Sequence, residues 1–240
     1  VLGRTRGRDA QFCADLMFWI MVSGILGARL AYVLENWSEY ASAPLSILRI
    51  DEGGLIFYGG FAAAGVAIFL YAHRQKIPAI PLLDFVLTAV PLSHAFGRIG
   101  CFLNGCCFGS CTGAPVAVHF PKGAPAWNVH YQAGLIDQLA ATSRGVHPVQ
   151  LYEAGYNLLI YGLLVWIFRR SPRRGSVSAA YLLLYALGRF VLEFFRGDRG
   201  DRLAVGGLSI GQVASVLPEA VGVVVLEDVV VKGQQARAEA

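Results

Sequence analysis

Six apolar stretches, each about long enough to cross a bilayer, leave this 240-residue chain few ways to fold. A helix needs roughly 20 apolar residues to cross the hydrocarbon core, where a helix satisfies its own backbone hydrogen bonds. The sequence therefore predicts an all-α, polytopic transmembrane bundle that forms a single integral membrane domain over residues 1–240. The expected spans are residues 16–34, 54–72, 80–101, 149–168, 176–195 and 208–231.

Charge content and charge placement agree with a membrane protein. Only 15% of the residues are charged, whereas soluble domains carry about 25%. The net charge of +4 does not indicate nucleic-acid binding, because the basic residues gather in short clusters between the spans and act as topology signals. These clusters place the N-terminus and loops 73–79 and 169–175 in the cytoplasm. Loops 35–53, 102–148 and 196–207 are then expected to face outward.

Two arginines interrupt the apolar stretches. Arg98 lies near the end of the third stretch and Arg189 within the fifth, so the topology predicts both in the outer halves of their spans. An ionised guanidinium at membrane depth costs at least ~2.5 kcal/mol, and an anionic ligand held there would offset that cost. The alternative is an arginine that extends to the interface as a topological anchor.

A glycine-rich segment surrounds Arg98. It runs from Gly97 to Gly109, reads GRIGCFLNGCCFG, and is expected to form an irregular turn. Glycines let the backbone approach a ligand closely, and irregular backbone at membrane depth is tolerated where it lines a cavity or is buried in protein. The guanidinium supplies a planar fork of donors that suits phosphate. The segment therefore predicts an intramembrane site for a phosphorylated or carboxylated molecule.

Further charges follow Arg189. Glu193 and Arg196 come four and seven residues after it, so all three lie on one face of a helix. Glu193 can pair with either arginine. For Glu193 and Arg196 a structural ion-pair ladder between helices is an equal alternative, whereas a functional role is favoured for the deeper Arg189.

Two more segments with unusual polar or glycine residues stand at the start of predicted spans. The second span begins with GGLIFYGG over residues 53–60, and the fourth begins with HPVQLYE over residues 147–153. Pro148 suits the first turn of a helix. His147 is a candidate general base, although a lone histidine before a proline is more often a cap or a surface residue.

Four cysteines fall close together, with the spacing C-x4-C-C-x3-C. They lie in or next to a loop expected to face the oxidising side, where a disulfide is plausible. A zinc or iron–sulfur site usually has C-x2-C pairs, which are missing here. Structural cysteines or a disulfide are favoured, and no metal or cofactor is expected. The residues are Cys101, Cys106, Cys107 and Cys111.

Five ordered motifs resemble the bacterial prolipoprotein diacylglyceryl transferase family. They read GGLIFYGG, HAFGRIGCFLNGCCFG, HPVQLYE, GRFVLEFFRGD and LSIGQ, and GARLAYV in the first span is similar too. The resemblance covers roughly residues 16–216. It implies a bacterial inner-membrane enzyme that transfers a diacylglyceryl group from phosphatidylglycerol to the lipobox cysteine of a prolipoprotein. A thioether forms and glycerol phosphate is released at the outer leaflet.

The resemblance also implies roles for individual residues. Arg98 and Arg189 would hold the phosphate and stabilise charge on the leaving group. The pocket would be shaped and lined by Asn104, Gly105, Gly109 and Tyr32. Glu193 and Arg196 would orient Arg189.

The residue that deprotonates the substrate thiol is left open by the resemblance. Tyr58 stands in the segment where some family members carry a histidine proposed as a base. His147 and His94 are weaker candidates, and an arginine-rich field that favours the thiolate is a further possibility. Family members also usually begin with another span ahead of residues 16–34.

Two other functions fit parts of the sequence. One is a transporter or lipid-binding membrane protein that keeps the arginine site without chemistry. The other is a membrane thiol–disulfide protein built on the cysteines.

Overall fold

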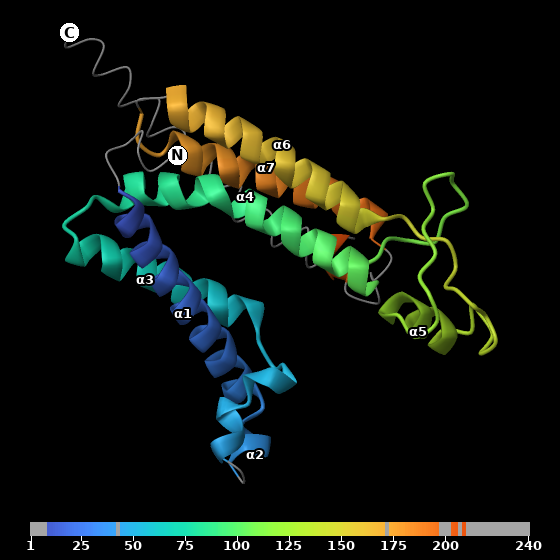
Figure 1. Ribbon diagram of the computed structural model, residues 1–240. Helices are drawn as coiled ribbons and strands as arrows, with labels where there is room; N and C mark the ends of the chain where they lie inside the picture. Colours follow the sequence, from blue (N-terminus) through green and yellow to red (C-terminus); the bar gives the residue numbers. More distant parts are fainter. Residues whose placement is uncertain (1–8, 42–43, 171–172, 197–202, 206–207, 210–240) are drawn as a thin grey trace. The chain divides into compact units, whose positions relative to one another are not determined.

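The computed structural model describes residues 9–41, 44–170, 173–196, 203–205 and 208–209 (Figure 1). They belong to two units, residues 1–85 and 86–240, and each is described by itself. The α-helices are α1 (Ala10–Glu35), α2 (Trp37–Tyr40), α3 (Phe57–Arg74), α4 (Ala79–Asn104), α5 (Pro125–Gln132), α6 (Val149–Arg170) and α7 (Ser176–Leu192). Short 3-10 helices are η2 (Pro44–Leu48), η3 (Ile50–Glu52) and η4 (Glu193–Phe195), and the strands are β1 (Leu203–Val205) and β2 (Leu208–Ser209).

Four helices in the described part of the chain are long and apolar enough to cross a membrane. They are α1, α4, α6 and the continuous segment Ser176–Phe195 formed by α7 and η4. These four candidate spans overlap four of the six predicted ones. The predicted span 54–72 forms α3, which is not among the four. Residues 208–209 of the last predicted span form β2, and the rest of it lies outside the described residues. The chain is a polytopic helical membrane protein.

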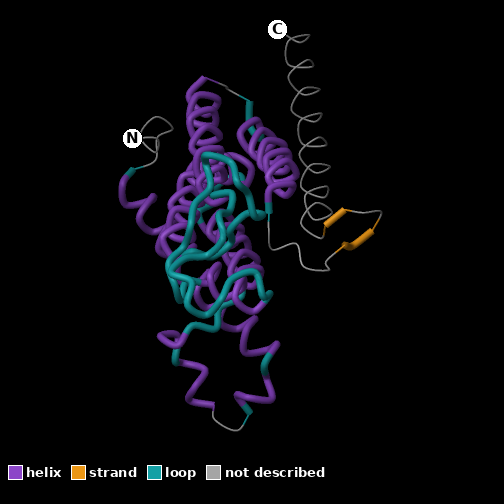
Figure 2. The backbone as a smooth tube through the Cα atoms, turned by 90° about the vertical axis from the view of Figure 1, so that its right-hand side faces the viewer, coloured by secondary structure: helices purple, strands orange, loops and turns teal. Residues whose placement is uncertain are grey.

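A short antiparallel ladder departs from the all-α prediction. β1 pairs with β2 (orange in Figure 2), with Leu203 opposite Ser209. Isolated β-bridges also occur, among them one between Gly109 and Arg196. The length of an apolar stretch predicts only membrane-spanning elements, so this strand pairing could not be predicted from it.

In the first unit, α1 and α3 pack through residues without bulky side chains. A Cβ atom placed on Gly27 would lie 2.3 Å from Cβ of Ala63 and 2.6 Å from the carbonyl oxygen of Gly59. A Cβ on Gly59 would lie 2.3 Å from Cβ of Ala31. Small residues let helix backbones approach closely in a membrane, where dispersion contacts drive helix association. The glycines of the GGLIFYGG motif therefore include a helix-packing residue.

Arg29 fixes the segment that joins α1 to α3. Its side chain is buried and donates to the carbonyl oxygens of Ser46, Ile47, Arg49, Gly53 and Gly54, at 2.8 to 3.1 Å. A guanidinium has five N–H donors, so these five bonds occupy all of them. Arg29 is a structural arginine.

In the second unit, α6 packs against α7 where the ring of Tyr156 lies over Gly188. The Tyr156 hydroxyl donates to the carbonyl oxygen of Leu184 at 2.6 Å. A Cβ on Gly188 would lie 1.8 Å from Cε1 of Tyr156. The absence of a side chain at Gly188 therefore brings the neighbouring Arg189 close to α6.

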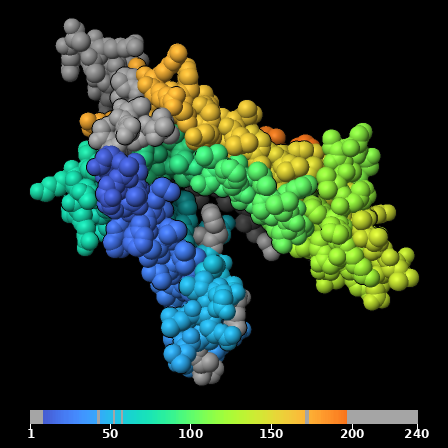
Figure 3. All heavy atoms as spheres, in the orientation of Figure 1, coloured from blue at the N-terminus to red at the C-terminus, as the bar shows by residue number. Residues whose placement is uncertain are grey.

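Residues 105–148 form a folded head (green to yellow in Figure 3) rather than a plain loop. The head contains α5 and a small core made of Phe108, Phe120, Ala126 and Val146. The buried Ser143 hydroxyl accepts from the Phe120 N–H at 3.0 Å, which ties the two arms of the head together. The predicted loop 102–148 thus begins three residues early, because residues 102–104 complete α4.

Candidate active site

The site is built where α4 ends. The N–H of Gly105 donates to the Phe102 carbonyl and the N–H of Cys106 to the Cys101 carbonyl, both at 3.1 Å. Gly105 has φ 74°, so the end of α4 is a Schellman motif with a left-handed glycine. The prediction that an irregular turn starts at Gly97 is wrong. Helical hydrogen bonding continues to Asn104, because a bilayer offers no other partner for the backbone groups.

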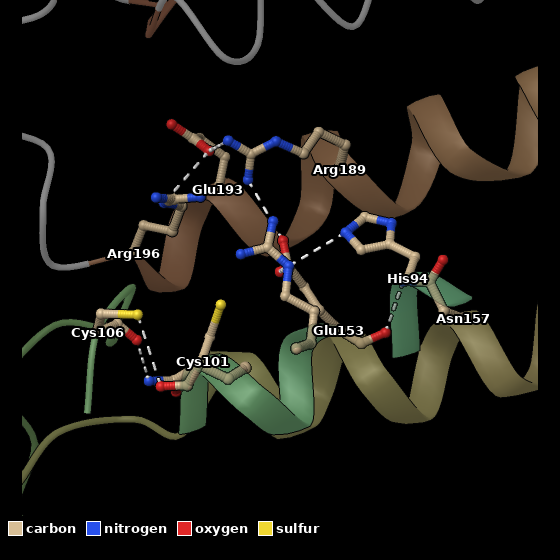
Figure 4. A network of polar contacts seen from close by, with 10 residues as sticks. His94, Cys101, Cys106, Glu153, Asn157, Arg189, Glu193 and Arg196 are labelled. Atoms are coloured by element: carbon tan, nitrogen blue, oxygen red, sulfur yellow. Dashed lines mark hydrogen bonds and ion pairs between the residues drawn. The ribbon is translucent and has the colours of Figure 1, made fainter. Parts of the chain in front are cut away.

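A buried carboxylate from α6 binds both predicted arginines (Figure 4). The Glu153 carboxylate pairs with Nε of Arg98 through Oε2 and with Nη1 of Arg189 through Oε1, at 3.5 Å for the second pair. The side chain of Glu153 is 5% exposed, against 18% for Arg98 and 21% for Arg189. One carboxylate thus joins α4, α6 and α7 and offsets part of two cationic charges.

Glu193 provides a second carboxylate at the end of α7. Its Oε2 lies 3.0 Å from Nη2 of Arg189 and 4.0 Å from Nε of Arg196. The predicted cluster of Arg189, Glu193 and Arg196 is therefore brought together. Glu193 itself begins η4 rather than continuing α7.

His94 lies beside Arg98 on α4, one turn earlier. Its Nε2 accepts from Nε of Arg98 at 3.1 Å, and its ring contacts Tyr185 of α7 at 5.6 Å between centroids. An acceptor nitrogen that faces a guanidinium has its lone pair engaged. His94 is therefore arranged to position Arg98 and is poorly placed to take a proton.

The two site arginines keep donors that Arg29 does not. Among the described residues, Arg98 makes its polar contacts through Nε alone, which leaves both terminal amino groups. Arg189 makes one contact through each terminal nitrogen, which leaves the Nε–H and one further N–H on each terminal nitrogen. These remaining N–H groups are the ones able to bind an anion in a planar fork.

Glu153 was not among the site residues predicted from the sequence. The signal that could have found it is a polar stripe on α6, since Gln150, Glu153 and Asn157 recur at helical spacing and all three are buried. Buried polar residues inside a membrane span usually face a functional interior. Gln150 uses its amide N–H to hold the Cys106 carbonyl oxygen at 2.6 Å, which links α6 to the end of α4.

His147 lies in an aromatic cluster at the start of α6. Its Nδ1 is 3.3 Å from the Tyr152 hydroxyl, and its ring contacts Phe195 at 5.6 Å. The His147 carbonyl accepts from the Gly109 N–H at 2.9 Å, and a Cβ on Gly109 would lie 2.6 Å from that oxygen. Gly109 therefore allows the head to pack on the start of α6. Pro148 precedes the helix and is not in its first turn.

Three thiols gather at the Schellman turn, and all five cysteines of the chain are free. Burial by itself raises the pKa of Cys106, but hydrogen bonds from Asn104, Cys107 and Cys101 outweigh it and lower that pKa. Burial, and then negative charge at Cys106 and Cys101, raises the pKa of Cys107 to about 11. The opposite directions indicate that one thiolate, at Cys106, is favoured and a second beside it is not.

Tyr32 and Tyr58 belong to the first unit. Tyr32 packs under the turn at Gly54, where an added Cβ would lie 2.7 Å from its ring, and its ring lies 5.8 Å from the Arg29 guanidinium. Tyr58 is on the first turn of α3 and is 76% exposed. Their predicted roles stay predictions.

The long apolar helices define a multi-pass membrane protein, and its two half-buried arginines around a buried carboxylate are of the kind that marks functional sites in such proteins. The chain matches the family model of prolipoprotein diacylglyceryl transferase over residues 2–227 and belongs to that family. It is thus a transferase of lipoprotein modification.

Named relatives span most of the chain. A phosphatidylglycerol–prolipoprotein diacylglyceryl transferase of Synechococcus elongatus is 36% identical over 228 residues, which cover 92% of this chain and 74% of the relative. The enzyme of the same name from Xanthomonas axonopodis pv. citri is 35% identical, over 93% of this chain and 78% of the relative. One from Xylella fastidiosa is 34% identical, over 89% and 76%.

Proposed function

We propose that this protein transfers the diacylglyceryl group of phosphatidylglycerol to the lipobox cysteine of prolipoproteins. Family membership supports the reaction. The assignment of the phosphate-binding site is supported by one observation: Arg98 and Arg189 both pair with Glu153, and both keep N–H donors that these pairs do not use. A phosphodiester supplies the single anionic charge that these donors suit.

The reaction needs charge stabilisation at the leaving group. The substrate thiolate attacks the glyceryl carbon that carries the phosphate ester, a C–S bond forms, and the C–O bond to the phosphate breaks. The electron pair of that bond leaves with glycerol phosphate, and the thiol proton goes to a base or to water. Arg98 and Arg189 would bind the phosphate oxygens as this charge grows. Fixed donors aimed at developing charge typically give the largest single contribution to catalysis.

Other residues would support this arrangement. Asn104, Gly105 and Gly109 are proposed to shape the phosphate pocket, and Tyr32 to line it. Glu193 and Arg196 would orient Arg189 through the ion pairs described above. For proton removal we propose Tyr58 or His147. The one side-chain hydrogen bond of His147 among the described residues uses Nδ1, not Nε2.

The proposal includes a location. The chain would form a bundle of six spans in the bacterial inner membrane, with the head on the outer face. Arg98 precedes the last residue of α4 by six positions and Glu153 follows the first residue of α6 by four. At 1.5 Å per residue these positions are about 6–9 Å inside the helix ends, the depth at which the headgroup of an outer-leaflet lipid would lie.

The test is thioether formation on a lipobox-cysteine peptide by purified protein in phosphatidylglycerol-containing micelles. Arg98→Lys and Arg189→Lys keep a positive charge but remove the fork, and each should lower the transfer rate by about 100-fold, as loss of one preorganised donor typically does. Arg144→Lys, on an exposed residue of the head, is the matched control and should transfer at the wild-type rate.

The same assay separates the transferase from a lipid-binding protein that lacks chemistry. A protein that only binds lipid would retain phosphatidylglycerol yet form no thioether in any variant. If the two lysine variants stay folded and transfer as fast as the wild type, the phosphate-binding role of these arginines is refuted.

A further inference from the structure

The three thiols at the end of α4 form a cluster that the transfer reaction does not use. The Sγ atoms of Cys101, Cys106 and Cys107 all lie within 4.8 Å of one another, and each side chain is half-buried. Within the described residues, no other group of three His, Cys, Asp or Glu side chains converges in this way. Cys111 lies apart from it, with its Sγ 3.6 Å from Nε2 of His130.

The helix end itself builds the cluster. In a Schellman motif, the residue that follows the left-handed glycine folds back on the last turn of the helix. Its side chain contacts the side chain of the residue five positions earlier. Here those two residues are Cys106 and Cys101, joined by the backbone bond from Cys106 to Cys101. The C-x2-C pairs of common zinc sites are therefore unnecessary, because the turn brings the two sulfurs together over a longer spacing.

Cys107 completes the cluster through an uncommon backbone conformation. Its φ is 56°, and among the described residues only Lys76 is another non-glycine with positive φ. A non-glycine residue in this region costs of order 1–3 kcal/mol and is held there by its surroundings. The preceding carbonyl, of Cys106, is fixed by the fully buried Gln150 of α6. The sulfurs are thus held together without a disulfide.

We propose that Cys101, Cys106 and Cys107 bind one thiophilic metal ion, of the cuprous class, through three thiolate sulfurs. Thiolates select soft ions such as Cu⁺. Among the residues that the structure describes, no fourth His, Cys, Asp or Glu joins the cluster. Three ligands suit a three-coordinate ion better than Zn²⁺, whose structural sites take four.

Charge balance supports the assignment. Binding replaces the thiol protons by metal–sulfur bonds and releases those protons to solvent, with no change of oxidation state. Three thiolates and one Cu⁺ leave two negative charges. Arg98, one helical turn before Cys101 on α4, supplies positive charge that Glu153 offsets only in part. A filled site would also fix the turn that follows Arg98 on α4.

The test is an anaerobic titration of the reduced, full-length protein in detergent with Cu⁺, in competition with a chromophoric chelator. One Cu⁺ per chain should bind, with an ultraviolet thiolate-to-metal band. Cys101→Ser, Cys106→Ser and Cys107→Ser should each weaken binding by at least about tenfold. Cys111→Ser and Cys13→Ser are matched controls and should bind as the wild type does.

A second readout needs no variant. Bound Cu⁺ should protect three cysteines, but not Cys111, from alkylation detected by mass spectrometry of the wild-type protein. Wild-type affinity in the triple serine variant, tighter binding of Zn²⁺ than of Cu⁺, or a disulfide within the cluster in the purified protein would each overturn the proposal. The assay measures metal and not transfer, so its failure leaves the proposed transferase function standing.

Discussion

At the scale of single residues, the chain uses arginine in two ways. Arg29 donates all five of its N–H groups to backbone carbonyls and so stabilises the segment between α1 and α3. Arg98 and Arg189 share a carboxylate and keep donors for a ligand. All three arginines lie near the end of an apolar helix. They differ in the groups that their guanidinium N–H donors contact. Sequence identified Arg98 and Arg189 through their position in apolar stretches, but it could not show which donors stay available.

Glu153 carries the first prediction at this scale. Glu153→Gln keeps the shape of the side chain but leaves Arg98 and Arg189 without the carboxylate between them. Removing one partner of a buried ion pair destabilises by about 3–5 kcal/mol, and the partial exposure of both arginines favours the lower figure. We expect the free energy of unfolding, measured by denaturant titration in micelles, to fall by about 3 kcal/mol.

The control is Asp137→Asn, on an exposed carboxylate of the head, which should leave stability within about 0.5 kcal/mol of the wild type. A double-mutant cycle with Arg98→Gln isolates the pair and should give a coupling energy of about 1–3 kcal/mol. A coupling energy near zero would show that the contact between Glu153 and Arg98 adds nothing to stability.

At the scale of elements, apolar length located the spans and missed what joins them. The stretches 16–34, 80–101, 149–168 and 176–195 correspond to helices because a bilayer permits little else for a long apolar segment. Helix α5 has only eight residues, and it is stabilised by the head core rather than by its own periodicity. Gly97 and Gly100 suggested a turn, yet the helical cost of about 1 kcal/mol per glycine is smaller than that of unpaired backbone groups in a membrane.

The packing of α6 on α7 gives a prediction for Gly188. In Gly188→Ala the new methyl group would overlap the Tyr156 ring, 1.8 Å from Cε1 in the present arrangement. Overpacking of this kind costs about 1–3 kcal/mol, and separating the helices moves Arg189 away from Glu153. Both the thermal midpoint in micelles and the transfer rate should therefore fall.

Gly162 on α6 provides the comparison, because an added Cβ there meets nothing within 4 Å. Gly162→Ala should keep the wild-type midpoint and rate. The cost of Gly188→Ala should be smaller in a Tyr156→Ala background than in the wild type, because the ring that the new methyl group overlaps is then absent. If Gly188→Ala alone behaves as Gly162→Ala does, the two helices do not depend on this contact.

At the scale of the whole molecule, the charged residues predict how the second unit is oriented in the membrane. Helix α6 has 22 residues, about 33 Å at 1.5 Å per residue, which matches a hydrocarbon core of about 30 Å. The head precedes this helix, and Arg169 and Arg170 end it. The two ends must then face opposite sides, and positive charge favours the cytoplasmic one. This orientation is predicted from sequence alone, because it depends on charge counts and not on packing.

Cysteine labelling tests that orientation in a chain whose five native cysteines are replaced by serine. Leu139→Cys places a thiol on the head, where Leu139 is 91% exposed, and Arg174→Cys places one between α6 and α7. In intact spheroplasts a membrane-impermeant maleimide should label Leu139→Cys at once and Arg174→Cys only after permeabilisation. The reverse order would turn the head toward the cytoplasm. It would also remove the outer-leaflet headgroup from the reach of Arg98 and Arg189, because both lie at the head end of their helices.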